Sequence, residues 1–336
     1  MSPIPPHLRP CPCCGGRRAP WGPLPPDRLA PGALPVSLVR CLVCGTLETV
    51  LPGEEAGRDA GVGAGGRAAE PSESPVGEQA PESPETGPGA YLPHAEPGGL
   101  TGWLAERSRM RKTELAARWS VSTASRLVDV GCGSGGFLAA CRRRWPHREL
   151  LGTEPDAGAA AAASRRGFRV LSASLEDPMP EPVRDAGVYT LWHVLEHLRD
   201  PGGALLHLRG GLAPEGRILL ALPNARAWER RLWGRHTLSW DPPRHRWHLT
   251  PQGLEGLVRS AGLEVAGRFS LISDDVYDAA GSLRWLLYSR AWTDARSVRG
   301  RAAMAAGLAA APMGLLLGLA APRDARASLG YVLVRG

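Results

Sequence analysis

From about residue 100 onward, short apolar runs alternate with stretches in which apolar residues recur every three or four positions. The short runs have the length of buried strands, and the stretches between them have the period of amphipathic helices. This alternation is typical of a parallel sheet with helices on both faces. It predicts an α/β fold with a helical lead-in at 103–119 and strands at 126–130, 149–153, 168–173, 187–192 and 216–222.

The end of the chain has a different pattern. Thr250 followed by Pro251 is typical of a helix start and predicts a helix over 251–262. Two further apolar runs, 263–272 and 328–336, are separated by a long insertion. We expect these two runs to pair as an antiparallel edge of the sheet.

The insertion contains an uncharged stretch, residues 302–322, which is long enough to span a bilayer. If the flanking runs pair in one sheet, both ends of the stretch lie on the same side, which excludes a single crossing. Its many alanines and Pro312 also weaken its affinity for a membrane relative to leucine. We therefore expect a bent helical hairpin packed on the domain, or a dimer contact, with a peripheral membrane contact through 302–322 as the alternative.

Composition divides the chain into three parts. Residues 53–98 are rich in Gly, Pro, Glu and Ser, which predicts a disordered linker. It separates a small N-terminal part, 1–52, from a large domain, 99–336, whose hydrophobic helical insertion covers about 275–327. The N-terminus has no apolar segment behind a basic start, so we expect a cytoplasmic protein with reduced cysteines, whether or not it associates with a membrane.

The net charge of +7 says little about the partner. Residues 53–98 hold nine acidic and two basic residues, so the rest of the chain is more basic than the total suggests. However, Lys112 is the only lysine among the 40 basic residues, and with the abundant Ala, Gly and Pro this is typical of a GC-rich coding sequence. The charge is therefore weak evidence for a nucleic-acid partner.

Four of the seven cysteines form two C-x-x-C-G pairs, at 11–15 and 41–45, with 26 residues between the pairs. Two such pairs make a tetrahedral thiolate cage for Zn²⁺. A ribbon this small cannot bury enough apolar surface to fold without metal, so we expect a structural zinc. The expected ligands are Cys11, Cys14, Cys41 and Cys44, and Cys13 could replace Cys14.

The stretch LVDVGCGSGGF, residues 127–137, contains G-x-G-x-x-G in Gly131, Gly133 and Gly136. A strand that ends in a glycine turn and opens a helix brings backbone amides close to a ligand. Asp129, at the end of the strand, would repel a pyrophosphate but suits the ammonium and sulfonium of S-adenosylmethionine. Glu154, at the tip of the next strand, can accept hydrogen bonds from both ribose hydroxyls of a nucleoside.

The motif L-V-D-V-G-C-G-S-G resembles the first motif of the class I S-adenosylmethionine-dependent methyltransferases. The resemblance continues in GTEPD, SLEDP, LWHVLEHLRDP, LAPEGRILLALPN and HLTPQGLEGLVRSAGLEV, and is similar to the quinone-biosynthesis-type O-methyltransferase branch. It implies a Rossmann-like, seven-stranded, mostly parallel sheet with an antiparallel edge hairpin. Zinc ribbons similar to the N-terminal one precede such domains in relatives of this type.

The resemblance also implies which residues contact the cofactor. Asp129 and the backbone of the glycine loop would hold the methionine part, Glu154 the ribose, and Ser174 with Leu175 the adenine edge. Many members have Asp where Ser174 stands, so Glu176 or Asp177 could meet the adenine instead. The implied cofactor-binding residues are Asp129, Gly131, Cys132, Gly133, Gly135, Glu154, Ser174, Leu175, Trp192 and His193.

The segment between the strand ending near 223 and Thr250 holds four tryptophans, three histidines and six arginines. A segment this long and aromatic is typical of a substrate lid. His245 is the first candidate for a general base, because a neutral imidazole can take a proton near physiological pH. His197, next to Glu196, is the second; in some quinone-pathway enzymes that this segment resembles, such a Glu-His pair is linked to a divalent metal.

Together these features predict a methyltransferase that uses S-adenosylmethionine and acts on a small-molecule or lipid-like acceptor, at oxygen. One alternative is a zinc-ribbon protein that binds or modifies RNA, although the chain has no compact basic run with an RNA-binding motif. The other is an NAD-dependent oxidoreductase, in which Asp129 would have to tolerate a pyrophosphate.

Overall fold

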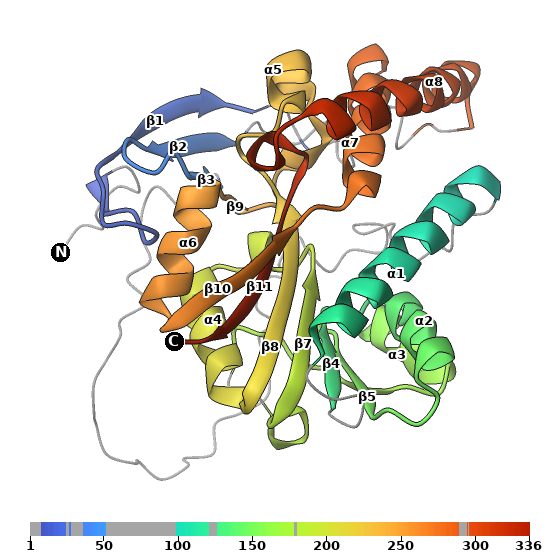
Figure 1. Ribbon diagram of the computed structural model, residues 1–336. Helices are drawn as coiled ribbons and strands as arrows, with labels where there is room; N and C mark the ends of the chain where they lie inside the picture. Colours follow the sequence, from blue (N-terminus) through green and yellow to red (C-terminus); the bar gives the residue numbers. More distant parts are fainter. Residues whose placement is uncertain are drawn as a thin grey trace, which may run out of the picture.

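The computed structural model of the chain describes residues 8–24, 27, 36–51, 99–120, 126–177, 180–288, 294 and 296–336. The predicted linker, 53–98, lies outside these residues. The described part forms a seven-stranded sheet with helices on both faces and a smaller four-stranded sheet beside it (Figure 1).

The large sheet has the topology that the sequence predicts. Its strands follow the order β10-β11-β8-β7-β4-β5-β6, and the five strands from β8 to β6 are parallel. β11 runs antiparallel to both β10 and β8, which confirms the predicted edge hairpin. The strands are β4 (Leu127–Val130), β5 (Leu150–Thr153), β6 (Arg169–Leu171), β7 (Ala186–Trp192), β8 (Leu212–Pro223), β10 (Leu263–Phe269) and β11 (Ser328–Arg335).

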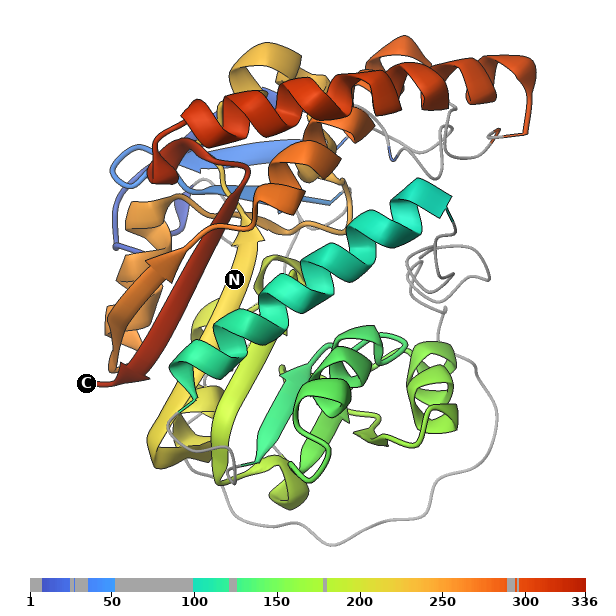
Figure 2. The same ribbon diagram turned by 45° about the vertical axis from the view of Figure 1, so that its right-hand side comes forward.

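Alternate residues of these strands are buried in two different cores, because successive side chains of a strand point to opposite faces. In β8, Ile218 and Leu220 join the core under α4 (Pro201–Gly211) and α6 (Pro251–Ser260), whereas Leu219 joins the core on the other face. That second core lies under α1 (Gly99–Trp119), α2 (Gly136–Arg144) and α3 (Ala157–Arg165). Figure 2 shows α1 crossing this face of the sheet.

The small sheet joins the N-terminal ribbon to the large domain. β1 (Arg18–Pro23), β2 (Ser37–Cys41) and β3 (Leu47–Val50) form an antiparallel meander, and β9 (Trp247–His248) pairs with β3. β9 belongs to the segment that the sequence indicates as a lid. The ribbon therefore shares a sheet with this lid and does not stand apart from the domain.

α6 supplies the second contact with the ribbon. Thr250 caps α6 as predicted, accepting a hydrogen bond from the amide of Gly253 at 3.1 Å. The same hydroxyl donates to the carbonyl oxygen of Cys44 at 2.7 Å. One turn further on, Gly256 lies so close to the carbonyl oxygen of Cys13 that a Cβ atom has no room. Only glycine at position 256 allows this approach.

The insertion between β10 and β11 differs from the expected bent hairpin within 302–322. This stretch lies in one helix, α8 (Val298–Ala320), which continues past Pro312, and the hairpin forms with α7 (Ile272–Leu287) instead. The small residues of α8 that face α7 lie on both sides of Pro312, so packing holds the helix together across it. α8 is long and apolar enough to cross a membrane, and 28% of its most apolar window is buried.

We expect Gly256→Ala to lower the melting temperature, because the new Cβ meets the carbonyl of Cys13. In an unobstructed helix the same change stabilises by up to about 1 kcal/mol. Gly210→Ala is the matched control, since Gly210 lies in α4 with open space where a Cβ would stand. Thermal unfolding of both variants tests the contact, and a Gly256→Ala protein as stable as the control variant would contradict it.

Candidate functional site

The glycine loop after β4 turns against the segment that follows β7. Gly131 adopts a φ of +67°, and a Cβ on it would lie 2.7 Å from Cγ2 of Val194. This position therefore needs glycine both for its backbone conformation and for the contact. Directly before the turn, the buried carboxylate of Asp129 accepts a hydrogen bond from the hydroxyl of Thr190 at 2.7 Å. Burial raises the pKa of Asp129 to about 7.

Glu154 holds the other side of this loop. Its two carboxylate oxygens accept hydrogen bonds from the amides of Gly133, at 2.8 Å, and Asp156, at 3.0 Å. Each carboxylate oxygen has a second lone pair, so these bonds orient the group and still leave it able to accept from a ribose. The loop and Glu154 thus form the kind of cradle that the sequence predicts around a nucleoside.

The residues proposed for the adenine edge lie in a short turn after β6. The Ser174 hydroxyl accepts a hydrogen bond from the amide of Glu176 at 3.2 Å, and the Leu175 side chain belongs to the core under α4. The carboxylate of Glu176 accepts from the amide of Arg199, whereas Asp177 is exposed. Of the two alternatives to Ser174, Asp177 is therefore the carboxylate that is less engaged with the fold.

Trp192 ends β7 and faces α1 and the glycine-loop helix. Its ring makes edge contacts with Phe137 and Phe269, with centroids 5.4 Å and 6.2 Å apart, and Nζ of Lys112 lies 5.2 Å from its centroid. The indole Nε1 is buried and donates to no group among the described residues. Such an atom is the kind of partner that a bound ligand satisfies.

His193 has the left-handed backbone conformation, with a φ of +60°, which is uncommon for a residue other than glycine. Its imidazole lies between two carboxylates, with Nδ1 3.4 Å from Oε1 of Glu196 and Nε2 3.3 Å from Oδ2 of Asp274. Burial by itself lowers the pKa of His193, but Asp274 and Glu196 together raise it to about 9. His193 is therefore an imidazolium at neutral pH.

Two residues of this site were missed by the sequence analysis, Lys112 and Asp274. Burial lowers the pKa of Lys112, and the nearest carboxylates that oppose this are Asp274 and Asp129. Both residues come from outside the motifs, Lys112 from α1 and Asp274 from the first turn of α7. The sole lysine of an arginine-rich chain was the one available signal.

The lid brings a second group of side chains together. Glu196, His197 and His245 offer ligand atoms that all lie within 4.8 Å of one another, and Glu196 is fully buried. Nδ1 of His197 lies 3.0 Å from the carbonyl oxygen of Arg244, and Nδ1 of His245 lies 2.9 Å from that of Ser239. Because Nδ1 of each ring donates to a carbonyl, Nε2 is the nitrogen of each ring that faces the rest of the group.

Nε2 of His245 lies 4.0 Å from Oε1 of Glu196. At this separation the carboxylate can stabilise a protonated imidazole, or the two groups can bind one divalent cation together. Burial, followed by the charge of His197, lowers the pKa of His245 to about 4, so the ring is neutral at physiological pH. The carboxylate of Glu196 accepts no hydrogen bond from the described residues. The two candidate bases of the sequence analysis thus lie together, with a buried carboxylate beside them.

The ribbon holds the backbone of this lid. The amide of Thr49 donates to the carbonyl of Arg246, and its hydroxyl donates to the carbonyl of His245, both at 2.8 Å. The guanidinium of Arg244 forms a bidentate pair with Asp27, at 2.8 and 2.9 Å. The conformation of His245 therefore depends on residues of the N-terminal part.

The four expected zinc ligands come together at one end of the ribbon. Sγ of Cys11 lies 3.7 Å from that of Cys44, and Sγ of Cys14 lies 3.5 Å from that of Cys41. Tetrahedral coordination with zinc–sulfur bonds of about 2.3 Å places two sulfurs about 3.8 Å apart. In addition, the amide of Val43 points at Sγ of Cys41, 3.4 Å away. The cluster fits Zn²⁺.

The parallel sheet has an antiparallel edge, and the glycine loop lies between the carboxylates Asp129 and Glu154. This is the arrangement that the sequence analysis expects of a class I S-adenosylmethionine-dependent methyltransferase. A protein-family model described as a methyltransferase domain matches residues 103–266.

Curated proteins are similar to part of the chain. Trans-aconitate 2-methyltransferase of Methylobacterium nodulans is 27% identical over 176 residues, which are 52% of this chain and 62% of that enzyme. The corresponding enzyme of Mycobacterium tuberculosis is 30% identical over 110 residues, 33% of this chain and 41% of that enzyme. The chain thus spans less than two thirds of the length of these relatives.

Among solved structures, the [4+2]-cyclase SpnF is similar with a TM-score of 0.47 and 20% identity, covering 67% of this chain and 80% of that one. The O-methyltransferase NcsB1 from neocarzinostatin biosynthesis, in complex with S-adenosylmethionine, has a TM-score of 0.41 and 24% identity, over 51% of this chain and 54% of that one.

We expect His193 to make stability depend on pH. Because its pKa is raised from 6.5 to about 9, its contribution is fully present below pH 6.5 and is lost as the pH rises through about 9. His193→Asn, which tolerates a positive φ, should therefore be less stable at pH 6.5 and should lack this loss between pH 7 and 9. Urea unfolding across this range tests it, with exposed His147→Asn as control. Equal slopes for wild type and His193→Asn would contradict the assignment.

Proposed function

We propose that the chain transfers a methyl group from S-adenosylmethionine to an oxygen of a small-molecule or lipid-like acceptor. The observation that carries this proposal is the placement of Asp129 and Glu154 on two sides of the glycine loop. This loop turns against Val194, which lies two residues before Glu196 and its neighbours His197 and His245. When bound, S-adenosylmethionine supplies an electrophilic methyl group on a sulfonium.

The residues of the chain would bind and orient the cofactor and the acceptor. Asp129 attracts the positively charged methionine part, Glu154 and the Gly133 amide hold the ribose side, and the Trp192 indole packs against the cofactor. His193, held between Glu196 and Asp274, fixes the start of α7 over the site. These groups orient the two reactants and exclude water, which by itself lowers the barrier of such a transfer substantially.

His245 is the proposed base, with His197 as the alternative. A neutral imidazole with its Nε2 lone pair near a buried carboxylate can accept the acceptor's proton, and Glu196 stabilises the imidazolium that results. The same three side chains could instead hold a divalent cation that lowers the pKa of an acceptor hydroxyl. Both versions place the acceptor oxygen beside the lid.

We further propose that Cys11, Cys14, Cys41 and Cys44 bind a structural zinc. The sulfur–sulfur distances support it. The small core of the ribbon, around Leu38 and Leu47, includes Trp240 of the lid. Zinc would fix the end of the ribbon that Thr250 and Gly256 of the large domain contact. Its role is therefore to keep the ribbon, and with it the lid, in place.

The relatives named as trans-aconitate 2-methyltransferases support a small-molecule acceptor. The arginines and the exposed apolar face of α8 are compatible with a lipid-like acceptor as well, and with a cytoplasmic protein that contacts a membrane peripherally. An RNA acceptor has no motif in its favour, and Asp129 disfavours the pyrophosphate of NAD.

Label transfer tests the function. Protein incubated with methyl-labelled S-adenosylmethionine and cell extract should label the small-molecule or lipid fraction. Asp129→Asn should reduce that label at least tenfold, because the carboxylate no longer offsets the cofactor's charge. Exposed Asp177→Asn tests the adenine alternative and should have a smaller effect. Label in the RNA or protein fraction would overturn the acceptor class, and equal labelling by Asp129→Asn would overturn the cofactor assignment.

The ribbon's effect on the lid is tested by Thr49→Val, which removes the hydroxyl that donates to the His245 carbonyl. We expect a several-fold lower kcat, an altered pH profile of kcat, and unchanged affinity for S-adenosylhomocysteine, since the cofactor cradle is untouched. Leu42→Ala, at an exposed position of the same ribbon, is the control. An equal loss of cofactor affinity, or a pH profile that matches wild type, would contradict a positioning role.

A further inference from the structure

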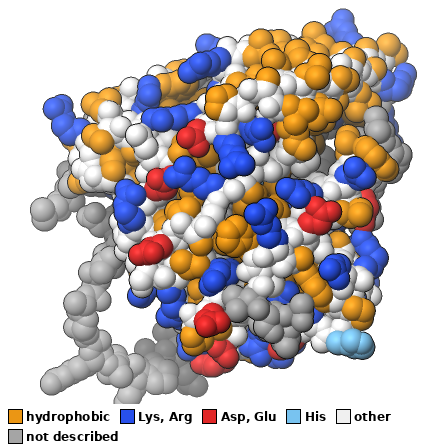
Figure 3. Space-filling view, viewed as in Figure 1, with side chains coloured by type: hydrophobic (Ala, Val, Ile, Leu, Met, Phe, Trp, Pro, Cys, Tyr) orange, Lys and Arg blue, Asp and Glu red, His pale blue; other side chains and the backbone are white. Residues whose placement is uncertain are grey.

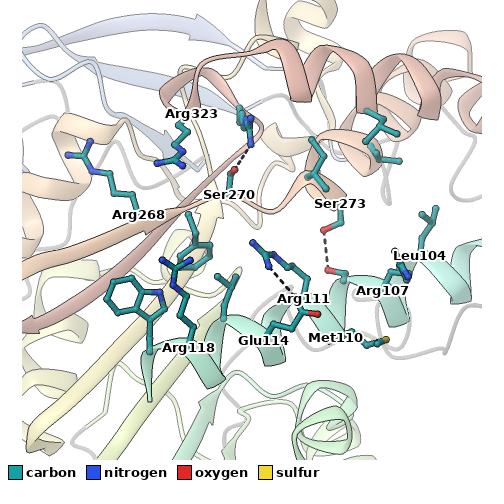
Figure 4. Close-up of a pocket in the computed structure, with 18 of the residues that line it drawn as sticks. Leu104, Arg107, Met110, Arg111, Glu114, Arg118, Arg268, Ser270, Ser273 and Arg323 are labelled. Atoms are coloured by element: carbon teal, nitrogen blue, oxygen red, sulfur yellow. Dashed lines mark hydrogen bonds and ion pairs between the residues drawn. The ribbon is translucent and has the colours of Figure 1, made fainter. Parts of the chain in front are cut away.

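A groove of about 830 Å³ lies outside the methyl-transfer site, between α1, the start of α7 and the end of α8 (Figure 4). Its walls are largely apolar, formed by side chains such as Trp103, Leu115 and Phe269. Its polar lining has a strong excess of positive charge. It consists of one glutamate, Glu114, three serines, and the six arginines Arg107, Arg111, Arg118, Arg268, Arg323 and Arg326.

Four of these six arginines lack a carboxylate partner among the described residues. Arg111 pairs with Glu114, Arg268 with Glu255, and Arg326 donates to the hydroxyl of Ser270 at 2.7 Å. Arg107 and Arg118 lie over the rings of Trp103 and Trp119, at 5.3 Å and 5.8 Å from their centroids. Arg323 forms no ion pair with a described residue and lines the groove near Arg326. The groove therefore suits an anion with an apolar neighbouring part.

The apolar surface continues beyond the groove along α7 and α8. Leu315 lines the groove, and the next residue, Leu316, is 66% exposed. Figure 3 shows apolar side chains gathered over the α7–α8 hairpin, with basic side chains around them. The small residues of α8 are used against α7, so the leucines face outward. The exposed large apolar residues of this surface are Tyr277, Leu286, Leu287, Val298, Leu315, Leu316, Leu317 and Leu319.

We propose that this surface docks on an anionic phospholipid membrane, with the outward leucines of α8 in the acyl region and the arginines of the groove on lipid phosphates. α8 is uncharged between Arg301 and Arg323, so arginines flank an apolar stretch as in helices that lie in a membrane interface. Anionic headgroups complement the excess of arginine. A second copy docked face to face would set these arginines against one another, and a nucleic acid would leave the leucines in water.

The groove shares its walls with the methyl-transfer site. Ser273 lines the groove and its neighbour Asp274 contacts His193, while Arg111 lines the groove and its neighbour Lys112 lies over Trp192. The hydroxyls of Ser108 and Ser273, 3.1 Å apart, join α1 to α7 between the two sites. A membrane on this surface would thus present a lipid-like acceptor close to the cofactor. This consequence rests on the proposed function, whereas the docking on a membrane does not depend on it.

Vesicle sedimentation with the full chain tests the docking, without cofactor or acceptor. We expect binding to phosphatidylcholine vesicles that contain about one third phosphatidylglycerol, at least tenfold weaker binding to pure phosphatidylcholine, and a decrease with added salt. Arg107→Ala and Arg323→Ala should each weaken binding roughly fivefold. Leu316→Gln with Leu319→Gln should weaken it further by removing the apolar contact.

Matched controls lie outside the groove and outside the α7–α8 hairpin. Arg165→Ala in α3 and Leu206→Gln in α4 change exposed residues of the same types and should bind like wild type. Melting temperatures of all variants confirm folding. Equal binding to both vesicle types, or arginine and leucine variants that bind like wild type, would overturn the proposal. The proposal would also be overturned if the wild-type protein did not bind anionic vesicles. This holds whether the protein instead dimerises or binds only short-chain soluble phosphatidic acid.

The two proposals fail separately. Vesicle binding without label transfer would leave the docking surface intact and count against the methyl-transfer proposal. Label transfer by a protein that does not bind anionic vesicles would support the methyl-transfer proposal and overturn the docking proposal.

Discussion

Buried carboxyl groups at the carboxyl-terminal edge of the parallel strands are the constraint around which the site is built. Asp129 and Glu196 are almost completely excluded from solvent, and Glu154 nearly so. A buried carboxylate is costly unless donors or cations compensate for it. Here the compensation comes from the Thr190 hydroxyl and from the amide of Gly133, which joins the glycine loop to Glu154. His193 compensates for the burial of Glu196 in the same way. The glycine loop and the segment after β7 are therefore held in place by the carboxyl groups that they surround.

The lid extends this arrangement to the N-terminal ribbon. In sequence the ribbon and the lid are some two hundred residues apart, yet β3 and β9 are neighbours in one sheet. The Asp27–Arg244 pair and the Thr49 hydroxyl add side-chain contacts on either side of His245. The shared sheet keeps the lid and its His245 in one orientation, while the large sheet carries Asp129 and the glycine loop. A ribbon of so few residues therefore has a physical role in holding the lid.

The α7–α8 hairpin shows how one insertion can serve two surfaces. Its first turn carries Asp274 to His193, and its far helix turns leucines outward. Glycines and alanines on α8 let the helices approach closely, which leaves the large side chains to the outer face. The result is a basic and apolar surface that adjoins the site through the walls of α1 and α7.

The sequence by itself determined the sheet, its antiparallel edge, the Thr250 cap and the class of cofactor. These features depend on local periodicity and on residues close together in the chain, such as Asp129 two positions before Gly131. The grouping of Cys11, Cys14, Cys41 and Cys44 in one cluster followed from their spacing in the same way. Only the tertiary structure decided the rest: that β9 joins the ribbon, that Lys112 and Asp274 enter the site, and that 302–322 continues as one helix past Pro312. Each of these depends on contacts between segments far apart in sequence, where packing overrides the local preference that a sequence pattern records.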